Sequence, residues 1–230
     1  MFGFLNHTAL HVLGEDASWA ELGGFATGLA CVWLVVRQHI ANWPVGIVNV
    51  ALLMVAFWAA GLYGDAGLQV IYVVLGFYGW WVWWRRDRSV RTARSRSTAD
   101  GHGSDAGELP VRRTRPAEWG WLAAAAAIAT AVLYWLLKTE LGSQVPLADA
   151  VTTTLSLVAT YGQCRKLVEN WWFWILADVV YVPLYAYKHL YLTTVLYVVF
   201  LGLSVTGLLA WRRDLRRADT GTLGATAATA

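Results

Sequence analysis

The feature that constrains this chain most is a pair of uncharged apolar runs that follow one another. The runs cover residues 43–62 and 66–84 and are separated by the short turn at 63–65. At about 1.5 Å per residue, each run is long enough to cross a hydrocarbon layer about 30 Å thick. A helix on the surface of a soluble core has a polar face, and neither run has one. The pair therefore predicts a transmembrane hairpin.

The same pattern returns 128 residues later in the chain. Asn42 and Trp43 align without a gap on Asn170 and Trp171. The other matches are Arg37 with Arg165, Leu62 with Leu190, Tyr63 with Tyr191, Gly79 with Gly207, Trp83 with Trp211 and Arg85 with Arg213. Leucine matches mean little in an apolar chain, but Asn-Trp, Gly, Trp and Arg in one register indicate an internal repeat.

Composition agrees with a membrane protein. Of the 230 residues, 57% are hydrophobic and only 14% are charged, and fifteen are tryptophan, a residue enriched at membrane interfaces. The net charge of +3 comes from arginines in loops, so it sets membrane topology and predicts no nucleic-acid partner. Cys31 and Cys164 lie inside apolar runs without paired spacing, so we expect buried thiols and neither a metal nor another cofactor.

We expect an all-α polytopic membrane protein with seven transmembrane helices in a 3+1+3 order. The predicted parts are an external amino-terminal segment (1–18), a three-helix repeat (19–84), an arginine-rich linker (85–118), a linker helix (119–137), a second repeat (146–211) and a tail (212–230). The first segment lacks a basic start, so it is no cleaved signal peptide, and we expect a short interfacial helix there. The linker should be mobile and solvated, and the tail disordered.

The unpaired fourth span sets the relation between the repeats. Three spans invert the chain across the membrane and a fourth restores its direction, so the two repeats run parallel, as in transporters whose substrate site lies between repeats near the midplane. In this arrangement every Lys and Arg except Lys138 and Lys188 falls on one face. The positive-inside rule then places the amino terminus outside and the carboxyl terminus in the cytoplasm.

Polar side chains inside the spans are candidates for a binding site, because they are costly in lipid unless they face protein or water. Asn49, Gln69, Trp174 and Asp178 lie deep, and we favour a cavity role for them. The polar and aromatic stripes are Gln69, Tyr72 and Trp80 in span three, Thr153, Ser156, Thr160 and Gln163 in span five, Trp171, Trp174, Asp178, Tyr181 and Tyr185 in span six, and Thr193, Thr194 and Tyr197 in span seven. Such a lining suits a planar, hydroxylated ligand.

Several of the polar and aromatic groups also have a structural explanation. The hydroxyls of span five would equally well bond their own backbone. The tryptophans at span ends, which we favour as interfacial anchors, are Trp43, Trp83, Trp84, Trp171 and Trp211. Asn42 and Asn170 precede spans and would serve as helix caps. Asp178 is either a proton-coupling carboxylate or a hydrogen-bonded structural group.

Three stretches resemble the PnuC family of bacterial vitamin transporters over about residues 19–213. They are NWPVGIVNV, LYGDAGLQVIYVVLGFYGWWVWW and ENWWFWILADVVYVPLYAYKHLYLTTVLY. The resemblance implies a fold related to SWEET sugar transporters and a homotrimer in the bacterial inner membrane. It also implies facilitated diffusion of nicotinamide riboside, an NAD precursor, with trapping by a cytosolic kinase. The implied substrate contacts are Asn49, Gln69, Tyr72, Asn170, Trp174, Asp178 and Tyr197.

Other classes of membrane protein fit less well. A photoreceptor needs a Schiff-base lysine in span seven, and residues 190–211 contain none. An ATP-driven pump needs a phosphate-binding loop of the GxxxxGK[ST] type, which is missing. The five histidines fall at predicted ends and in loops without ligand spacing, so we expect no enzyme. A thiamine or riboflavin carrier and a SWEET-like sugar transporter remain open.

Overall fold

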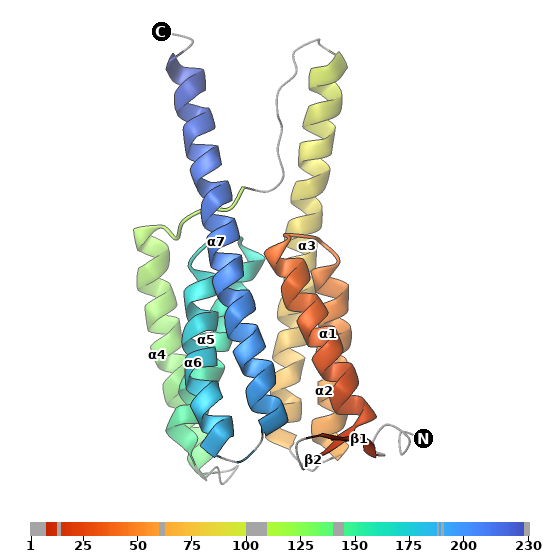
Figure 1. Cartoon of the computed structure of the whole chain (residues 1–230). Coiled ribbons are helices and arrows are strands. Elements are labelled where there is room, and N and C mark those ends of the chain that lie inside the picture. Colours follow the sequence, from red (N-terminus) through yellow and green to blue (C-terminus); the bar gives the residue numbers. More distant parts are fainter. Residues whose placement is uncertain are drawn as a thin grey trace.

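The computed structural model describes residues 8–12, 15–59, 63–99, 110–139, 145–187, 189 and 191–227. Within these residues the chain forms a bundle of seven helices (Figure 1). They are α1 (Trp19–Val36), α2 (Asn42–Ala59), α3 (Tyr63–Ala99), α4 (Pro116–Thr139), α5 (Pro146–Cys164), α6 (Asn170–Tyr187) and α7 (Tyr191–Ala227). The predicted all-helical fold is confirmed.

Length and hydropathy agree with membrane crossing for part of this bundle. Three helices have apolar spans of sufficient length, at Ala66–Arg88, Pro116–Thr139 and Tyr191–Ala218. Shorter apolar stretches cover Leu22–Val36 and Asn42–Trp58. The remaining helices, α5 and α6, carry the polar stripes, and several of their polar side chains are buried against neighbouring helices.

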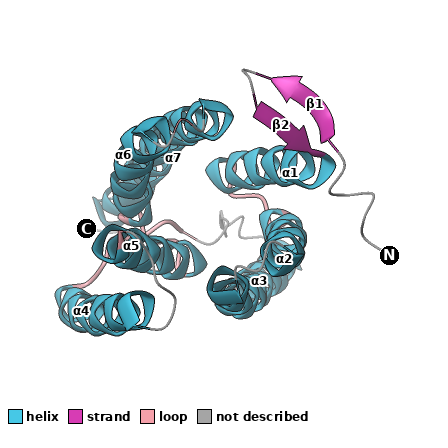
Figure 2. Cartoon of the chain, turned by 90° about the horizontal axis from the view of Figure 1, so that it is seen from below, coloured by secondary structure: helices cyan, strands magenta, loops and turns pink. Residues whose placement is uncertain are grey.

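The helices form two groups of three with α4 outside them. Viewed along the bundle, α1 to α3 lie on one side and α5 to α7 on the other (Figure 2). The groups meet where α1 packs on α7 and α3 packs on α5, so equivalent helices make equivalent contacts. Helix α4 packs on α5, and most of its side chains are exposed. This arrangement is consistent with the predicted 3+1+3 order.

The turn after the first helix of each group has the same backbone conformation, and both turns lie at one end of the bundle. Gln38, after α1, has a φ of 53°, and Lys166, after α5, has a φ of 50°. These residues are 128 positions apart, the spacing of the sequence repeat. We call this end, where the α1–α2 and α5–α6 loops lie and from which α3 and α7 extend, the arginine-rich end (Figure 1).

The spacing of Trp and Gly that recurs in both repeats has a packing explanation. In the first repeat Trp43 on α2 meets Trp83 on α3 edge to face, with ring centroids 5.4 Å apart at 87°. In the second, Trp171 and Trp211 meet at 5.4 Å and 88°. The first ring of each pair also lies on a glycine, Gly79 or Gly207, where an added Cβ would come within 2.1 or 2.3 Å of the indole.

The prediction that these tryptophans anchor the chain at the membrane interface is therefore wrong for four of the five. Trp43, Trp83, Trp171 and Trp211 are each no more than 4% exposed and belong to the buried core. Trp84 is the exception, since it is 43% exposed and Arg88 lies 4.1 Å above its ring. The first four are buried because two helices approach closely at each glycine.

The amino-terminal segment is not the interfacial helix that we expected. Strand β1 (Thr8–Val12) pairs antiparallel with β2 (Glu15–Ser18), and this small hairpin lies beside the start of α1 (Figure 2). The first strand contains the β-branched residues Thr8 and Val12, which favour extended backbone. Residues 1–7 lie outside the described part of the chain.

The linker and tail are more ordered than their composition suggested. Helix α3 continues through the arginines to Ala99, and α7 continues to Ala227. Extending an existing helix needs no new nucleus, and Arg and Ala are good helix formers. The end of the linker is docked, since Val111 is buried and Arg112 exchanges backbone hydrogen bonds with Lys166 and Val168 at 3.1 and 3.0 Å. Residues 100–109 lie outside the described part.

Candidate functional site

A polar and aromatic cluster lies halfway along the helices, and both repeats contribute to it. The hydroxyl of Tyr72 on α3 interacts with the side chain of Ser156 on α5. Tyr181 on α6 interacts with Ser156 and with Thr152, one turn earlier on α5. Because Tyr72 belongs to the first repeat and the others to the second, the cluster occupies the interface at which parallel-repeat transporters hold their substrates.

Aromatic rings from α6 and α7 surround this point. The ring of Tyr197 lies 4.8 Å from Tyr181 and 5.1 Å from Tyr185, the second pair nearly parallel at 17°. Phe200, one turn along α7, meets the Tyr197 ring at 5.8 Å and 79°. We call these four rings the tyrosine cluster. They offer a π surface together with phenolic hydroxyls, a combination that suits a flat polar ligand.

Asp178 is the buried acid of this region. It is 4% exposed, and its Oδ2 accepts a hydrogen bond from the Ser204 hydroxyl on α7 at 3.1 Å. Among the side chains that the structure describes, it forms no ion pair. Its counterpart 128 residues earlier is Val50, and that of Ser204 is Gly76, so the acid breaks the symmetry of the repeats. One side of the interface is therefore acidic and the other is not.

Asn49 connects the first repeat to the cluster. Its Nδ2 donates to the Gly24 carbonyl at 2.7 Å and to the Thr27 hydroxyl at 2.8 Å, so it fixes α2 against α1. A Cβ placed on Gly28 would lie 3.7 Å from this nitrogen and 3.3 Å from Phe200 of α7. Asn49 thus lies near the tyrosine cluster while its amide hydrogens serve the helix packing.

The hydroxyls of α5 bond mainly their own helix. Thr152, Ser156 and Thr160 each donate to the carbonyl four residues earlier, at 2.8 to 2.9 Å. A hydroxyl has one donor and two acceptor sites. Once the donor is used within the helix, only acceptors are available to a ligand. The stripe therefore favours ligand groups that donate hydrogen bonds.

The other predicted site residues, Gln69, Trp174 and Asn170, differ in where they lie relative to the cluster. Gln69 is buried on α3, one turn before Tyr72, and therefore near the cluster. Trp174, one turn before Asp178 on α6, is half-buried against the core that contains Trp171. Asn170 is distant from the cluster, since it begins α6 about 12 Å before Asp178 at about 1.5 Å per residue.

Asn170 braces the loop before α6 and does not cap the helix as predicted, because its side chain donates to a carbonyl and its Oδ1 accepts from no backbone N–H. Its Nδ2 donates to the Leu167 carbonyl, as the equivalent Asn42 does to the His39 carbonyl at 2.8 Å. The side-chain oxygen of Asn42 then accepts from Gln163 at 3.4 Å. The position equivalent to Gln163 is Val35, which has no donor, and the buried Oδ1 of Asn170 has no hydrogen-bond partner. The structure thus brings Asn49, Gln69, Tyr72, Asp178 and Tyr197 to the cluster or near it, packs Trp174 against the buried tryptophan core, and leaves Asn170 at the arginine-rich end.

The arginine-rich end is closed by a pair of equivalent bonds between the repeats. The indole Nε1 of Trp83 donates to the carbonyl of Gln163, and that of Trp211 donates to the carbonyl of Val35, each at 3.3 Å. Both donors and both acceptors are related by the 128-residue repeat. We call these two bonds the tryptophan clasp. Each bond joins the third helix of one repeat to the first helix of the other, so the repeats cannot separate here without breaking both.

Loop side chains reinforce the clasp. Lys166 donates to the Oε1 of Gln38 at 2.9 Å, and Gln38 donates to Asp214 on α7 at 2.7 Å. The ammonium of Lys166 also lies 4.5 Å above the Trp83 ring. Arg165 donates to the Tyr78 hydroxyl at 3.5 Å, and this contact raises the pKa of its guanidinium, so the side chain stays charged. These contacts all cross from one repeat to the other.

Two site residues were missed from the sequence. Ser204 follows Tyr197 by seven residues on the same face of α7, so its spacing would have identified it. Thr27, the partner of Asn49, is an isolated hydroxyl in an apolar helix and gave no such signal. Among the residues that the structure describes, no group of three or more His, Cys, Asp or Glu side chains is placed to hold a metal ion.

Known proteins resemble this chain in sequence and in structure. A family model described as nicotinamide mononucleotide transporter matches residues 18–213. The nicotinamide riboside transporter PnuC of Escherichia coli (strain K12) is 28% identical over 237 residues, which cover 92% of both chains. The riboflavin/roseoflavin transporter RibM of Streptomyces davaonensis is 32% identical over 218 residues, which cover 93% of this chain and 95% of RibM. The crystal structure of the Vitamin B3 transporter PnuC matches 86% of this chain and 83% of its own, with a TM-score of 0.64 and 25% identity.

Proposed function

Because this chain belongs to the nicotinamide mononucleotide transporter family, we propose that it imports nicotinamide riboside across the bacterial cell membrane. The protein is a multi-pass membrane transporter by family and by the apolar character of its helices. The observation that carries the choice of substrate is Asp178. Its buried carboxylate lies on the same helix as two rings of the tyrosine cluster and pairs with no described cation.

The charge of the ligand explains why an acid in this position is useful. Nicotinamide riboside carries a cationic pyridinium ring, which is attracted both to a carboxylate and to aromatic faces. A buried carboxylate without a cation is costly, so the site favours a ligand that brings the missing positive charge. The proposed pose places the pyridinium between Trp174 and Asp178, which share one face of α6.

The remaining groups suit the ribose and the amide. Thr152 presents an acceptor site because its hydrogen is bonded within α5, so it would receive a ribose hydroxyl. Ser156, whose hydroxyl already faces Tyr72 and Tyr181, would hold these two rings in place. Gln69 and Tyr72 face α5 from the first repeat and would bond the carboxamide. Asn49 would then act mainly by fixing α1 to α2 beside the ligand.

We further propose seven membrane spans, with the amino terminus outside and the arginine-rich end in the cytoplasm. The concentration of Lys and Arg at that end supports this orientation. Reporter fusions within residues 95–110 should therefore report the cytoplasm, and an external signal would contradict the topology. The exposed apolar face of α4 leaves room for the subunit contacts of a homotrimer.

The tryptophan clasp would act as the cytoplasmic gate. Rocking of one repeat against the other would break its two bonds and open the site inward, as expected of alternating access. Asp178 is the one buried acid described at the interface, and the sequence has no phosphate-binding loop, so we propose passive exchange. A cytosolic kinase would then trap the substrate by phosphorylation.

The direct test is uptake of labelled nicotinamide riboside into proteoliposomes that contain no kinase. The internal concentration should rise to the external one and stop there. Accumulation driven by a proton or sodium gradient would contradict passive exchange and would assign Asp178 to ion coupling. Empty liposomes and protein-containing liposomes with excess unlabelled substrate are the controls.

Riboflavin is the second candidate, since RibM is 32% identical to this chain. Its ring system is larger and uncharged, so it would stack on the tyrosine cluster without using Asp178. Adding riboflavin or thiamine as a competitor in the uptake assay separates these cases. Uptake of labelled riboflavin without uptake of nicotinamide riboside would replace our proposal with this one.

A further inference from the structure

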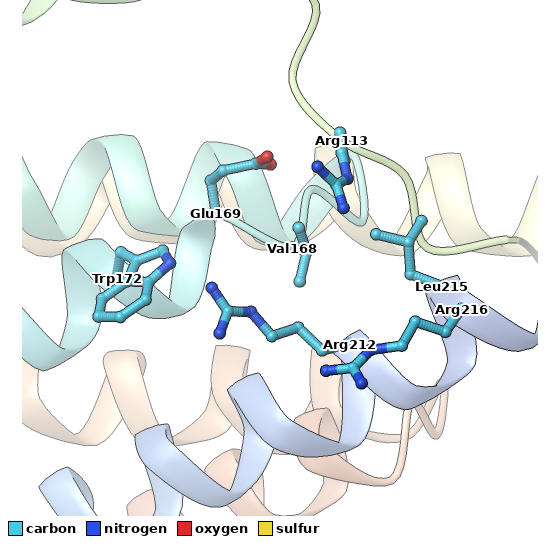
Figure 3. Close-up of a pocket in the computed structure, with 7 residues that line it drawn as sticks. All are labelled: Arg113, Val168, Glu169, Trp172, Arg212, Leu215 and Arg216. Atoms are coloured by element: carbon cyan, nitrogen blue, oxygen red, sulfur yellow. The ribbon is translucent and has the colours of Figure 1, made fainter. Parts of the chain in front are cut away.

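A pocket lies on the outer side of the arginine-rich end, away from the tyrosine cluster. Its volume is about 220 Å³, and it is lined by Arg113, Val168, Glu169, Trp172, Arg212, Leu215 and Arg216 (Figure 3). The lining comes from three separate parts of the chain, namely the end of the linker, the start of α6 and the cytoplasmic part of α7. At about 30 Å³ per water, the pocket has room for a small anion and several waters.

Three guanidinium groups border this pocket and one carboxylate accompanies them. Arg113, Arg212 and Arg216 all line it (Figure 3). The carboxylate of Glu169 is held by Thr114, whose backbone nitrogen and hydroxyl donate to its Oε2 at 3.0 and 2.9 Å. The lining therefore has a surplus of positive charge. Guanidinium groups bind phosphate oxygens in paired hydrogen bonds, which makes phosphate the matching anion.

An apolar surface continues from the pocket along the bundle. Trp172 is 50% exposed with the Arg212 guanidinium 5.2 Å above its ring, and Leu176 and Val179 follow it at helical spacing on the exposed face of α6. On α7, Leu209 and Val205 precede Arg212 at the same spacing and are also exposed. A tryptophan at the level of the headgroups, above apolar side chains and beside arginines, is the expected surround of a lipid headgroup.

We propose that this pocket binds a phosphate group and that the phosphate is that of an anionic phospholipid. Arg113, Arg212 and Arg216 hold the phosphate, Trp172 packs against the glycerol region, and the acyl chains follow the exposed side chains of α6 and α7. The lipid would connect the linker end to α6 and α7. The proposal is independent of the transported substrate, because the pocket lies apart from the site between the repeats.

Binding to the purified full-length protein tests this proposal. Native mass spectrometry would measure retention of phosphatidylglycerol against phosphatidylcholine, whose headgroup is neutral overall. A soluble arm would measure glycerol 3-phosphate by calorimetry. The doubly substituted Arg113→Gln/Arg212→Gln protein should lose affinity for the anion by about tenfold or more. The control Arg213→Gln/Arg217→Gln removes the same charge from exposed positions of α7 outside the pocket and should retain it.

An opposite change keeps the test informative if the double variant folds poorly. Glu169→Gln preserves an acceptor for Thr114 and removes the negative charge, so it should tighten anion binding about threefold. Selective retention of phosphatidylglycerol with this pattern supports a lipid, and binding of glycerol 3-phosphate alone supports the phosphate site with a soluble source. Equal effects of the pocket and control variants, no preference for an anion, or a change only in oligomeric state would overturn the proposal.

Discussion

The contact between Gly207 and Trp171 gives a sharp test of the packing within each repeat. A Cβ at Gly207 would lie 2.3 Å from the Trp171 ring, far closer than van der Waals contact allows. The ring is only 1% exposed and lies edge to face against Trp211, which is fully buried, so it has no space into which to move. Gly207→Ala should therefore destabilise the bundle although alanine favours helices.

The magnitude follows from two opposing effects. Overpacking a tight core by one carbon costs about 1–3 kcal/mol. Replacing a helical glycine by alanine contributes about 0.5–1 kcal/mol in the other direction. Gly202→Ala in the same helix isolates the first effect, because no atom lies within 4 Å of the added Cβ. The helix-propensity gain is shared, so Gly207→Ala should be less stable than Gly202→Ala by about 1–3 kcal/mol.

Unfolding of the purified protein in mixed micelles, with increasing denaturing detergent, measures this difference. The first repeat provides a replicate, since Gly79→Ala meets Trp43 while Gly67→Ala meets no atom within 4 Å. We expect the same ranking in both repeats. If Gly207→Ala and Gly202→Ala have the same stability, or if only one repeat shows the difference, the proposed packing of glycine against tryptophan is wrong.

Two further predictions concern the gate and the site. Trp211→Phe removes the clasp bond to Val35, which costs about 0.5–1.5 kcal/mol and should make opening at this end more frequent. In a Cys31→Ala background, the fully buried Cys164 should therefore react with a maleimide about 2- to 10-fold faster. An unchanged rate would show that the clasp does not limit opening. In calorimetry, Trp174→Ala should weaken binding of nicotinamide riboside about tenfold or more, while Trp174→Phe should retain part of the affinity. Trp84→Ala should bind normally. Equal effects of Trp84→Ala and Trp174→Ala would refute the stacking role.

The sequence allowed much of the fold to be predicted, because the constraints that matter are local or repeated. Run length predicted the helices, and the 128-residue register paired Trp43 with Trp171 and Gly79 with Gly207. The same register reappears in the turns at Gln38 and Lys166. The family resemblance agreed with these patterns and supplied the candidate site.

Other features depended on contacts that a single sequence does not reveal. A tryptophan at a span end looks the same whether it faces lipid or another helix, so the burial of Trp83 and Trp211 was unexpected. Asn170 looked equally suitable as a ligand contact or a cap, but its side chain donates to the Leu167 carbonyl of the preceding loop instead. The pairing of Asp178 with Ser204 required the relative rotation of α6 and α7, which apolar periodicity does not determine.

The central claim is that a buried acid between the repeats selects a cationic ligand. Nicotinamide riboside and its reduced, uncharged form have nearly the same size, so they separate charge from shape. Calorimetry on the purified protein should show that the cation binds about tenfold or more tightly than the reduced form, and that Asp178→Asn removes most of this preference. Equal affinity for the two forms in the wild-type protein, or a preference that Asp178→Asn leaves unchanged, would contradict the account.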